Sequence, residues 1–273
     1  MKTILVATDF SGAAKNAANY AADMALAIGA DLFLLNTFQV PVVYSEAPLI
    51  MNLDDMEKTA EKTLDELKDQ LIRSKRQKLT IEREVRVGNF YQELKSVCDQ
   101  INPYVVVMGS QGTTAAERVF FGGHTVHAMK QLEWPLITVP LTATFSEMKK
   151  ICLACDFDKI KDTIPVDEIK MLVRDFNASL YVLNTGKQDK YNPEIVFETR
   201  LLKEMLAPVN PEYHFISNDN IDQSIIEFTE KNHIDLLIVL PKRYGLLEKI
   251  THSSHTKQFV LHSHVPVMSL HHQ

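Results

Sequence analysis

The chain repeats itself, and this repeat constrains its fold more than any single motif. The segment MKTILVATDF at position 1 aligns without gaps to MKKICLACDF at position 148, with six identities in ten residues. ADLFLLNTF at position 30 matches ASLYVLNTG at 178, and HTVHAMKQLEWPLITVP at 124 matches HTKQFVLHSHVPVMSLH at 255. Because the three blocks keep their order, the sequence predicts two copies of one structural unit. The polar junction near residue 144 divides them into expected domains at 1–143 and 144–273.

Each copy alternates apolar, strand-like segments with segments of helical periodicity. In the first copy, buried strands are predicted at residues 2–8, 31–38, 79–87, 104–108 and 136–140. The first helix is introduced by Ser11 or Asp9 and ends at Gly29. Further helices are predicted at 53–74, 89–101 and 123–132. Such alternation predicts the α/β class, as two tandem doubly wound five-stranded parallel-sheet domains of Rossmann-like form.

A glycine-rich stretch lies at the edge of this predicted sheet where ligands bind. GSQGTTAAERVFFGG, residues 109–123, holds four of the nine glycines of the chain. Ligands of doubly wound sheets sit beyond the carboxyl ends of the strands, where the strand order reverses, and Asp9 and Gly109 both follow strands there. Glycine lets the backbone adopt positive φ and approach a ligand closely, and a helix start favours phosphate. The stretch therefore predicts a phosphate cradle.

The spacing of this stretch points to a family. Neither a P-loop nor a dinucleotide-binding fingerprint is present. Gly109 is followed after two residues by Gly112 and after nine more by Gly122. Together with VATDFS at the first strand and PLITVP at the last, this pattern resembles the universal stress protein family, and the repeat makes the chain similar to a tandem two-domain member. The resemblance covers nearly the whole chain.

The resemblance implies that the first domain binds ATP. It places Asp9 beside the adenosine, backbone of Thr37 and Met108 near adenine and ribose, and the glycines and the helix start around the phosphates. The expected cofactor-binding residues are Thr8, Asp9, Thr37, Met108, Gly109, Gly112, Gly122, Gly123, His124 and Thr125. The family has Ser or Thr after its third glycine, whereas Gly123 and His124 follow here, so a hydroxyl would have to come from Thr125. Whether the nucleotide is ATP, ADP or AMP, and whether Mg²⁺ accompanies it, stays open.

The function implied is that of a sensor or regulatory module in the stress response. No general base, nucleophile or metal-ligand set accompanies the glycines, so slow ATP hydrolysis is the most that is expected. Two alternatives stay open: a dimerisation or scaffold protein of the same fold that binds no nucleotide, and an adenylyl-transfer relative using Arg118 or His124. Because the family dimerises through its last strand, the two domains are expected to pair there within one chain. Other surfaces would then serve any homodimer.

The second copy departs from the first at the glycine positions. Leu240 and Arg243 stand where the first copy has Gly109 and Gly112, and Ser253 and Ser254 replace its glycine pair. Asp156 still stands opposite Asp9. The second domain is therefore not expected to bind nucleotide in the same way.

Composition excludes several other partners. A net charge of −6 and a pI near 5.9 give no broad basic field for nucleic acid or an anionic membrane. No signal-peptide core and no apolar run long enough for a membrane span is found, so a cytoplasmic location is expected.

Cysteine and histidine patterns do not predict a metal or redox site. Cys152 and Cys155 have the C-x-x-C spacing, but an odd separation on a strand sends them to opposite faces of the sheet. His252 and His255 could share a helix face and hold a metal, yet no third ligand is placed to complete that site, so no metal is expected. The terminal His271 and His272 are expected to be disordered.

Overall fold

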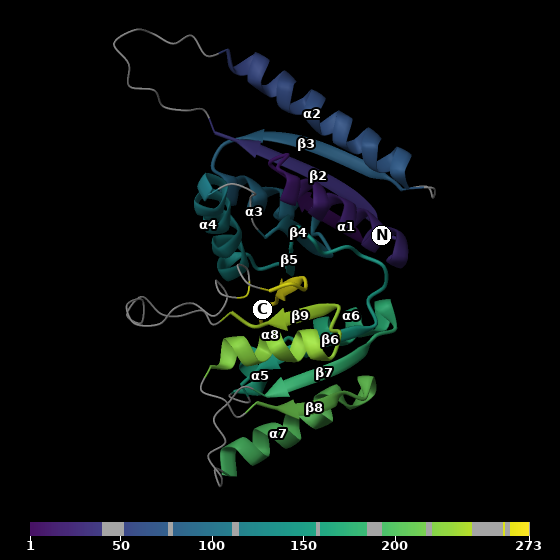
Figure 1. Ribbon diagram of the computed structural model, residues 1–273, viewed down its shortest axis with the longest axis vertical. Helices are drawn as coiled ribbons and strands as arrows, with labels where there is room; N and C mark the ends of the chain where they lie inside the picture. The colour runs from purple at the N-terminus through teal and green to yellow at the C-terminus, as the bar shows by residue number, and fades with distance from the viewer. Residues whose placement is uncertain are drawn as a thin grey trace, which may run out of the picture.

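The fold is given by a computed structural model that describes residues 1–39, 52–75, 79–110, 115–156, 159–184, 193–216, 220–241, 259 and 263–272 (Figure 1). The first half comprises β1 (Thr3–Ala7), α1 (Gly12–Ile28), β2 (Asp31–Phe38), α2 (Leu53–Ser74), β3 (Ile81–Val87), α3 (Phe90–Ile101), β4 (Val105–Gly109), α4 (Ala115–Gln131) and β5 (Leu136–Val139). The second half comprises β6 (Lys150–Cys155), α5 (Ile160–Thr163), α6 (Val166–Phe176), β7 (Ser179–Asn184), α7 (Pro193–Leu206), the short 3₁₀ helix η1 (Ala207–Val209), β8 (Glu212–Phe215), α8 (Ile221–Lys231), β9 (Leu236–Val239) and β10 (Val267–Ser269).

All the strands of the described residues join one sheet. Its ten strands run in the order β3-β2-β1-β4-β5-β10-β9-β6-β7-β8. Pairing is parallel within each half, while β5 and β10 pair antiparallel, with Thr138 opposite Val267 and Leu136 opposite Ser269. The expected α/β class with a mostly parallel sheet is therefore confirmed.

Helices cover both faces of the sheet, as the continuous apolar strands require. Alternate residues of β1 enter different buried clusters, because side chains along a strand point to opposite faces. Ile4 and Val6 belong to the cluster that includes Leu64 of α2, whereas Leu5 belongs to the one that includes Leu94 of α3. Each cluster contains side chains from both halves, so the core continues across the junction of β5 and β10.

Helix α1 packs against the central strands β1 and β4 of the first half. The Ser11 hydroxyl accepts a hydrogen bond from the Ala14 N–H and caps its start, and Gly29 ends it in the left-handed conformation at φ 64°. Its buried side is mostly alanine, including Ala17 and Ala21. These small side chains let the helix backbone lie close against the sheet.

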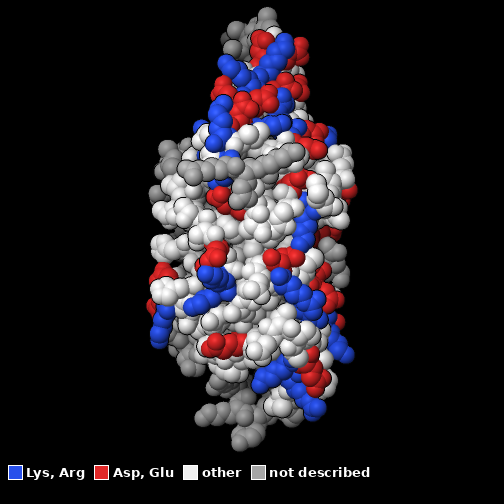
Figure 2. All heavy atoms as spheres, turned by 90° about the vertical axis from the view of Figure 1, so that its right-hand side faces the viewer, with Lys and Arg blue, Asp and Glu red and all other residues white. Residues whose placement is uncertain are grey.

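Helix α2 is a charged helix on the outside of the molecule. Only its leucines Leu64, Leu67 and Leu71 are buried, and Figure 2 shows Lys, Arg, Asp and Glu intermingled over the tip that it forms. Arg83 of β3 binds both carboxylate oxygens of Asp65 at 2.5 and 2.6 Å, and this hydrogen bonding lowers the pKa of Asp65. Among the helices described here, none combines the length and apolar character needed to cross a bilayer.

The two halves also meet through polar and aromatic contacts beside the sheet. Asp175 of α6 receives a hydrogen bond from the Tyr104 hydroxyl at 2.8 Å and pairs with the Lys2 ammonium at 2.5 Å. Burial, followed by this hydrogen bond, raises the pKa of Tyr104. Next to them, Phe145 of the connecting segment packs edge-on against Tyr20 of α1 at 5.2 Å between ring centroids.

The segment that connects β5 to β6 is fixed by one side chain of α1. The amide nitrogen of Asn16 donates to the carbonyl oxygens of Pro140 and Ala143, both at 2.9 Å. These two carbonyls lie 124 and 127 residues from Asn16 in the sequence, so this side chain ties α1 to the segment that leaves β5.

Replacing Asn16 should therefore weaken the fold. We expect Asn16→Ala to lower the free energy of unfolding by about 1–3 kcal/mol, because the hydrogen bonds from its amide to two carbonyls are lost. The matched control is Asn19→Ala, since among the described residues the Asn19 amide donates to the Lys15 carbonyl of its own helix. That change should cost nothing measurable, because Ala favours helix. Urea unfolding of both variants makes the comparison, and an equal loss in the two would contradict the role given to Asn16.

Candidate functional site

The first half has its topological switch point between β1 and β4. From β1 the chain continues outward through β2 and β3, whereas β4 and β5 lie on the other side of β1. Crossovers in opposite directions leave a crevice between the two strands at their carboxyl ends. Asp9 follows β1 and Gly109 ends β4, so the structure brings these two predicted residues to the same crevice.

The turn after β1 is held by side-chain hydrogen bonds to its backbone. The Thr8 N–H donates to the Leu35 carbonyl at 2.9 Å, and the Thr8 hydroxyl accepts from the Phe10 N–H at 3.1 Å. The Asp9 carboxylate accepts from the Ser11 N–H at 2.9 Å. Of the two expected caps of α1, Ser11 is the one observed. Asp9 stabilises the turn just ahead of the helix and stays half-buried at the crevice.

Close packing explains why residue 109 is glycine, whereas the sequence suggested positive φ or the approach of a ligand. A Cβ at this position would lie 2.8 Å from the Ala13 carbonyl carbon and 3.0 Å from the Ala14 nitrogen. Its φ lies outside the left-handed region, in contrast to Gly29. Close packing of β4 against the start of α1 therefore accounts for this glycine, and neither positive φ nor a ligand is needed to explain it.

The expected helix start at residue 123 is wrong. Helix α4 begins at Ala115, so Gly122 and Gly123 lie inside it. The sequence AAER that opens the helix consists of good helix formers, and their propensity outweighs that of the glycine pair. A Cβ on the exposed Gly123 would meet nothing within 4 Å. Gly112 lies outside the described residues.

The two residues after the glycine pair lie in the same helix. The buried Thr125 hydroxyl donates to the Gly109 carbonyl at 3.3 Å and so ties α4 to the end of β4. His124 is exposed, and its ring packs edge-on against Phe90 of α3 at 5.3 Å. In this conformation the hydroxyl expected to serve the phosphates is engaged with the backbone of the protein.

Thr37 and Met108 lie on the two strands that flank β1. Thr37 is half-buried near the end of β2, opposite Arg86 of β3. Met108 is buried in β4, opposite Thr138 of β5. The predicted adenosine-side residues are thus gathered around the end of β1, whereas Gly122 to Thr125 belong to the body of α4.

Sequence reasoning missed Asn36, which also contributes to this edge. Its side chain is buried near the end of β2, and its amide donates to the Thr8 carbonyl at 2.8 Å. The repeat carried a signal for it, because the triplet LNT occurs at 35–37 and again at 183–185.

The sequence of this chain is similar to that of a known protein family. The model of the universal stress protein family matches residues 1–140. The chain belongs to the universal stress protein family. No match to it was found among curated protein sequences.

Solved structures share the fold over nearly the whole chain. A universal stress protein from Archaeoglobus fulgidus DSM 4304 superimposes with a TM-score of 0.74 at 17% identity, covering 99% of this chain and 96% of the other. A putative universal stress protein from Pseudomonas aeruginosa UCBPP-PA14 gives a TM-score of 0.63 at 12% identity, covering 99% and 93%. A universal stress protein in complex with cAMP covers 50% of this chain and 96% of its own, with a TM-score of 0.39 and 22% identity.

In the second half of this universal stress protein, the residues at the equivalent edge of the sheet differ from those of the first half. Asp156 follows β6 and Leu240 follows β9, at the switch point equivalent to that of Asp9 and Gly109. The Glu198 carboxylate of α7 accepts a hydrogen bond from the Ile160 N–H at 2.9 Å, at the start of the helix that follows. An acidic side chain of the chain itself thus occupies a helix start there. Arg243, Ser253 and Ser254 lie outside the described residues.

The C-x-x-C pair is structural, as expected. Cys155 belongs to the buried cluster on one face of the sheet and Cys152 to the cluster on the other. Burial raises the pKa of Cys152 to about 12 and also raises that of Cys155, so both remain thiols at neutral pH.

Two predictions about histidines have different outcomes. The described residues contain no group of three or more His, Cys, Asp and Glu side chains arranged to hold a metal. His252 and His255 lie outside them. The expected disorder of His271 is wrong: its side chain is buried, and its Nε2 lies 2.9 Å from the Met129 carbonyl oxygen of α4. The terminal residues after β10 therefore help to hold α4 on the sheet.

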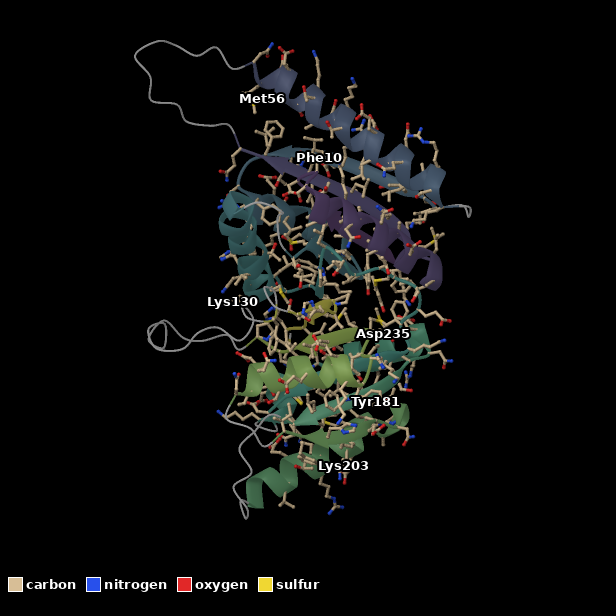
Figure 3. All side chains as sticks on the ribbon, viewed as in Figure 1. Phe10, Met56, Lys130, Tyr181, Lys203 and Asp235 are labelled. Carbon is tan, nitrogen blue, oxygen red and sulfur yellow. The ribbon has the colours of Figure 1, made fainter. Side chains whose placement is uncertain are left out.

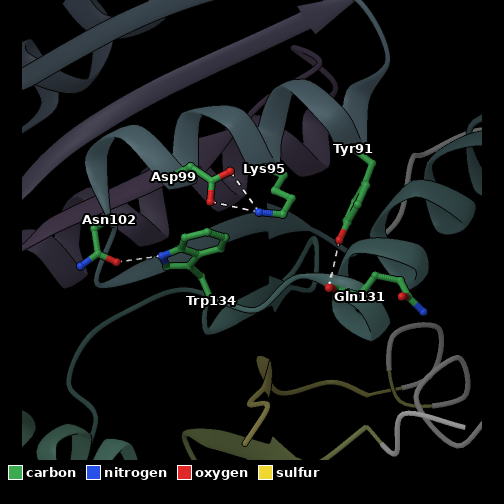
Figure 4. Close-up of polar contacts among 6 residues, drawn as sticks. All are labelled: Tyr91, Lys95, Asp99, Asn102, Gln131 and Trp134. Atoms are coloured by element: carbon green, nitrogen blue, oxygen red, sulfur yellow. Dashed lines mark hydrogen bonds and ion pairs between the residues drawn. The ribbon is translucent and has the colours of Figure 1, made fainter. Parts of the chain in front are cut away.

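Trp134 packs away from the crevice, at the amino ends of β4 and β5 (Figure 4). Its indole N–H donates to the Asn102 side chain at 2.9 Å, and the Lys95 ammonium lies 5.3 Å from its ring centroid. Lys95 also pairs with Asp99, one turn along α3. These contacts give this tryptophan a role in packing.

Gly109 and Gly123 should respond oppositely to the same substitution. Gly109→Ala should lower stability by about 1–3 kcal/mol, because the new methyl group overpacks against α1. Gly123→Ala should raise it by about 0.5–1 kcal/mol, because alanine favours the helix and its Cβ enters open space. Thermal unfolding of the two variants tests both. A loss of stability in Gly123→Ala would contradict a helical α4 at this position.

Proposed function

We propose that this universal stress protein binds ATP, or the related nucleotides ADP or AMP, in a first domain at residues 1–143 and acts as a sensor or regulatory module in the stress response. The observation that carries the proposal is the position of Asp9 and Gly109 on either side of the switch point between β1 and β4. Open α/β sheets bind their ligands at such points. Membership of the family supports the choice of an adenine nucleotide.

The adenosine end of the site is the part that described side chains can support. One Asp9 oxygen accepts from the Ser11 N–H, and no hydrogen bond between the other oxygen and the described residues is found. A carboxylate oxygen is an acceptor, so it suits the amino group of adenine or the hydroxyls of ribose. Thr37 and Met108 flank it on the neighbouring strands.

The phosphate end rests on the resemblance rather than on the observed conformation. Contacts from Gly112, Gly122, Gly123, His124 and Thr125 to phosphates, with or without Mg²⁺, stay a prediction. Since Gly122 to Thr125 lie within α4, such contacts would require this part of the helix to open. No catalytic step is assigned to these residues.

In the proposal, residues 144–273 form a second domain that keeps the scaffold without the same nucleotide site. Glu198 supports this, because its carboxylate occupies the start of α5, the helix that follows the strand equivalent to β1. The two domains would pair through β5 and β10, leaving other surfaces for a homodimer. A cytoplasmic location belongs to the same proposal, in keeping with the buried free thiols of Cys98, Cys152 and Cys155.

One observation favours a second candidate function. Gly109 is explained by packing against α1 alone, as it would be in a scaffold or dimerisation protein of this fold that binds no nucleotide. Binding measurements separate the two candidates.

Calorimetric titration with ATP tests the proposal. The wild-type chain should bind a single ATP, and Asp9→Ala should raise the Kd by about tenfold, the loss of one charged hydrogen bond. Asp156→Ala is the matched control, because it removes the equivalent carboxylate of the second half and should leave the Kd unchanged. Absence of ATP, ADP and AMP binding to the wild-type chain would favour the scaffold function. A loss of affinity in Asp156→Ala alone would place the site in the second half.

A further inference from the structure

The buried side-chain amide of Asn36 lies beside the turn that carries Asp9. It lies near the end of β2 with 5% of its surface exposed, among the apolar side chains of the strand. Buried polar side chains are retained where they form specific hydrogen bonds, because burial without a partner is costly. Among the described residues, the Asn36 amide donates to the Thr8 carbonyl at 2.8 Å.

This bond acts on the turn that carries Asp9. Through it, the peptide unit between Thr8 and Asp9 is fixed on its carbonyl side, while the Leu35 carbonyl fixes the Thr8 N–H. The next residue, Phe10, has φ 66°, a left-handed conformation that is costly for a bulky side chain. Phe10 packs against the buried cluster that includes Leu64 of α2 (Figure 3). The turn is therefore a constrained one, held by its neighbours in a conformation that the isolated segment would disfavour.

We propose that Asn36 is a positioning residue for the nucleotide: by holding the Thr8 carbonyl, it fixes the direction in which Asp9 presents its carboxylate to the adenosine. This inference rests on the proposed function of the first half. Asn36 acts through Asp9 and makes no contact with the nucleotide itself. Removing its amide leaves the Thr8 carbonyl without this donor and lets the turn relax, so that Asp9 loses its fixed direction.

The repeat provides a matched position in the second half. Leu183 pairs with Ala154 as Leu35 pairs with Ala7, which makes Asn184 the equivalent of Asn36. Asn184 is also buried, with 8% of its surface exposed. An identical substitution at Asn184 should therefore disturb the protein to a similar degree without affecting a nucleotide in the first half.

The experiment combines this control with a double-mutant cycle. ATP affinity is measured by calorimetry for the wild-type chain, Asn36→Leu, Asn184→Leu, Asp9→Ala and the double variant with Asn36→Leu and Asp9→Ala. Leucine has the branched shape of asparagine and the same number of side-chain heavy atoms, but no donor. We expect Asn36→Leu to raise the Kd about fivefold to tenfold, the effect of losing one well-placed hydrogen bond, and Asn184→Leu to leave it within about twofold. In the Asp9→Ala background, Asn36→Leu should change the Kd by less than about twofold, because the Asp9 carboxylate through which Asn36 acts is already absent.

Three outcomes would overturn the inference. They are an unchanged Kd in Asn36→Leu, an equal rise in Asn184→Leu, and an undiminished effect of Asn36→Leu when Asp9 is already alanine. Thermal unfolding of each variant shows that the folded protein is being titrated. If Asn36→Leu does not fold, Asn36→Ala removes the same donor without adding branched methyl groups and is held to the same criteria. Failure of the wild-type chain to bind any adenine nucleotide would instead overturn the proposed function, and this inference with it.

Discussion

The antiparallel pairing of β5 and β10 is the contact on which the rest of the structure depends. Each half alone is a parallel sheet that would end at an apolar strand with unpaired backbone groups. Such an exposed edge strand favours aggregation. Pairing Leu136 to Thr138 with Val267 to Ser269 satisfies both strands at once. The two buried clusters then run through the junction, so that one continuous core replaces two smaller ones. A larger core buries a greater share of its surface and is easier to stabilise.

Much of this architecture could be predicted from the repeat and the apolar periodicity. The strands of the first half and helices α1 to α3 begin and end close to the expected residues, because patterning, the Ser11 cap and the Gly29 C-cap all indicate the same structure. The expected reversal of strand order beside Asp9 and Gly109 agrees with the observed order, in which β1 lies between β2 and β4. Family membership, expected from the spacing of the glycines, is confirmed over residues 1–140.

The details of the site were less predictable, for identifiable physical reasons. Sequence spacing cannot show that a glycine is required by a neighbouring helix, as Gly109 is by the close approach of α1. It also cannot show that AAER begins a helix strong enough to include Gly122 and Gly123. Asn36 was overlooked because a polar residue in an apolar strand is conspicuous only once its partner, the Thr8 carbonyl, is known.

The ten-stranded sheet has a further geometric consequence. Neighbouring strands rotate by roughly 20–25° from one another, so the seven steps from β2 to β7 amount to about half a turn. That rotation offsets the reversal at β5 and β10, and the arrowheads of β2 and β7 point to the same side in Figure 1. The carboxyl ends of β2 and β7 therefore lie on one common surface, although the two halves are joined by an antiparallel pair of strands. A single large partner docking on that surface would touch both halves together.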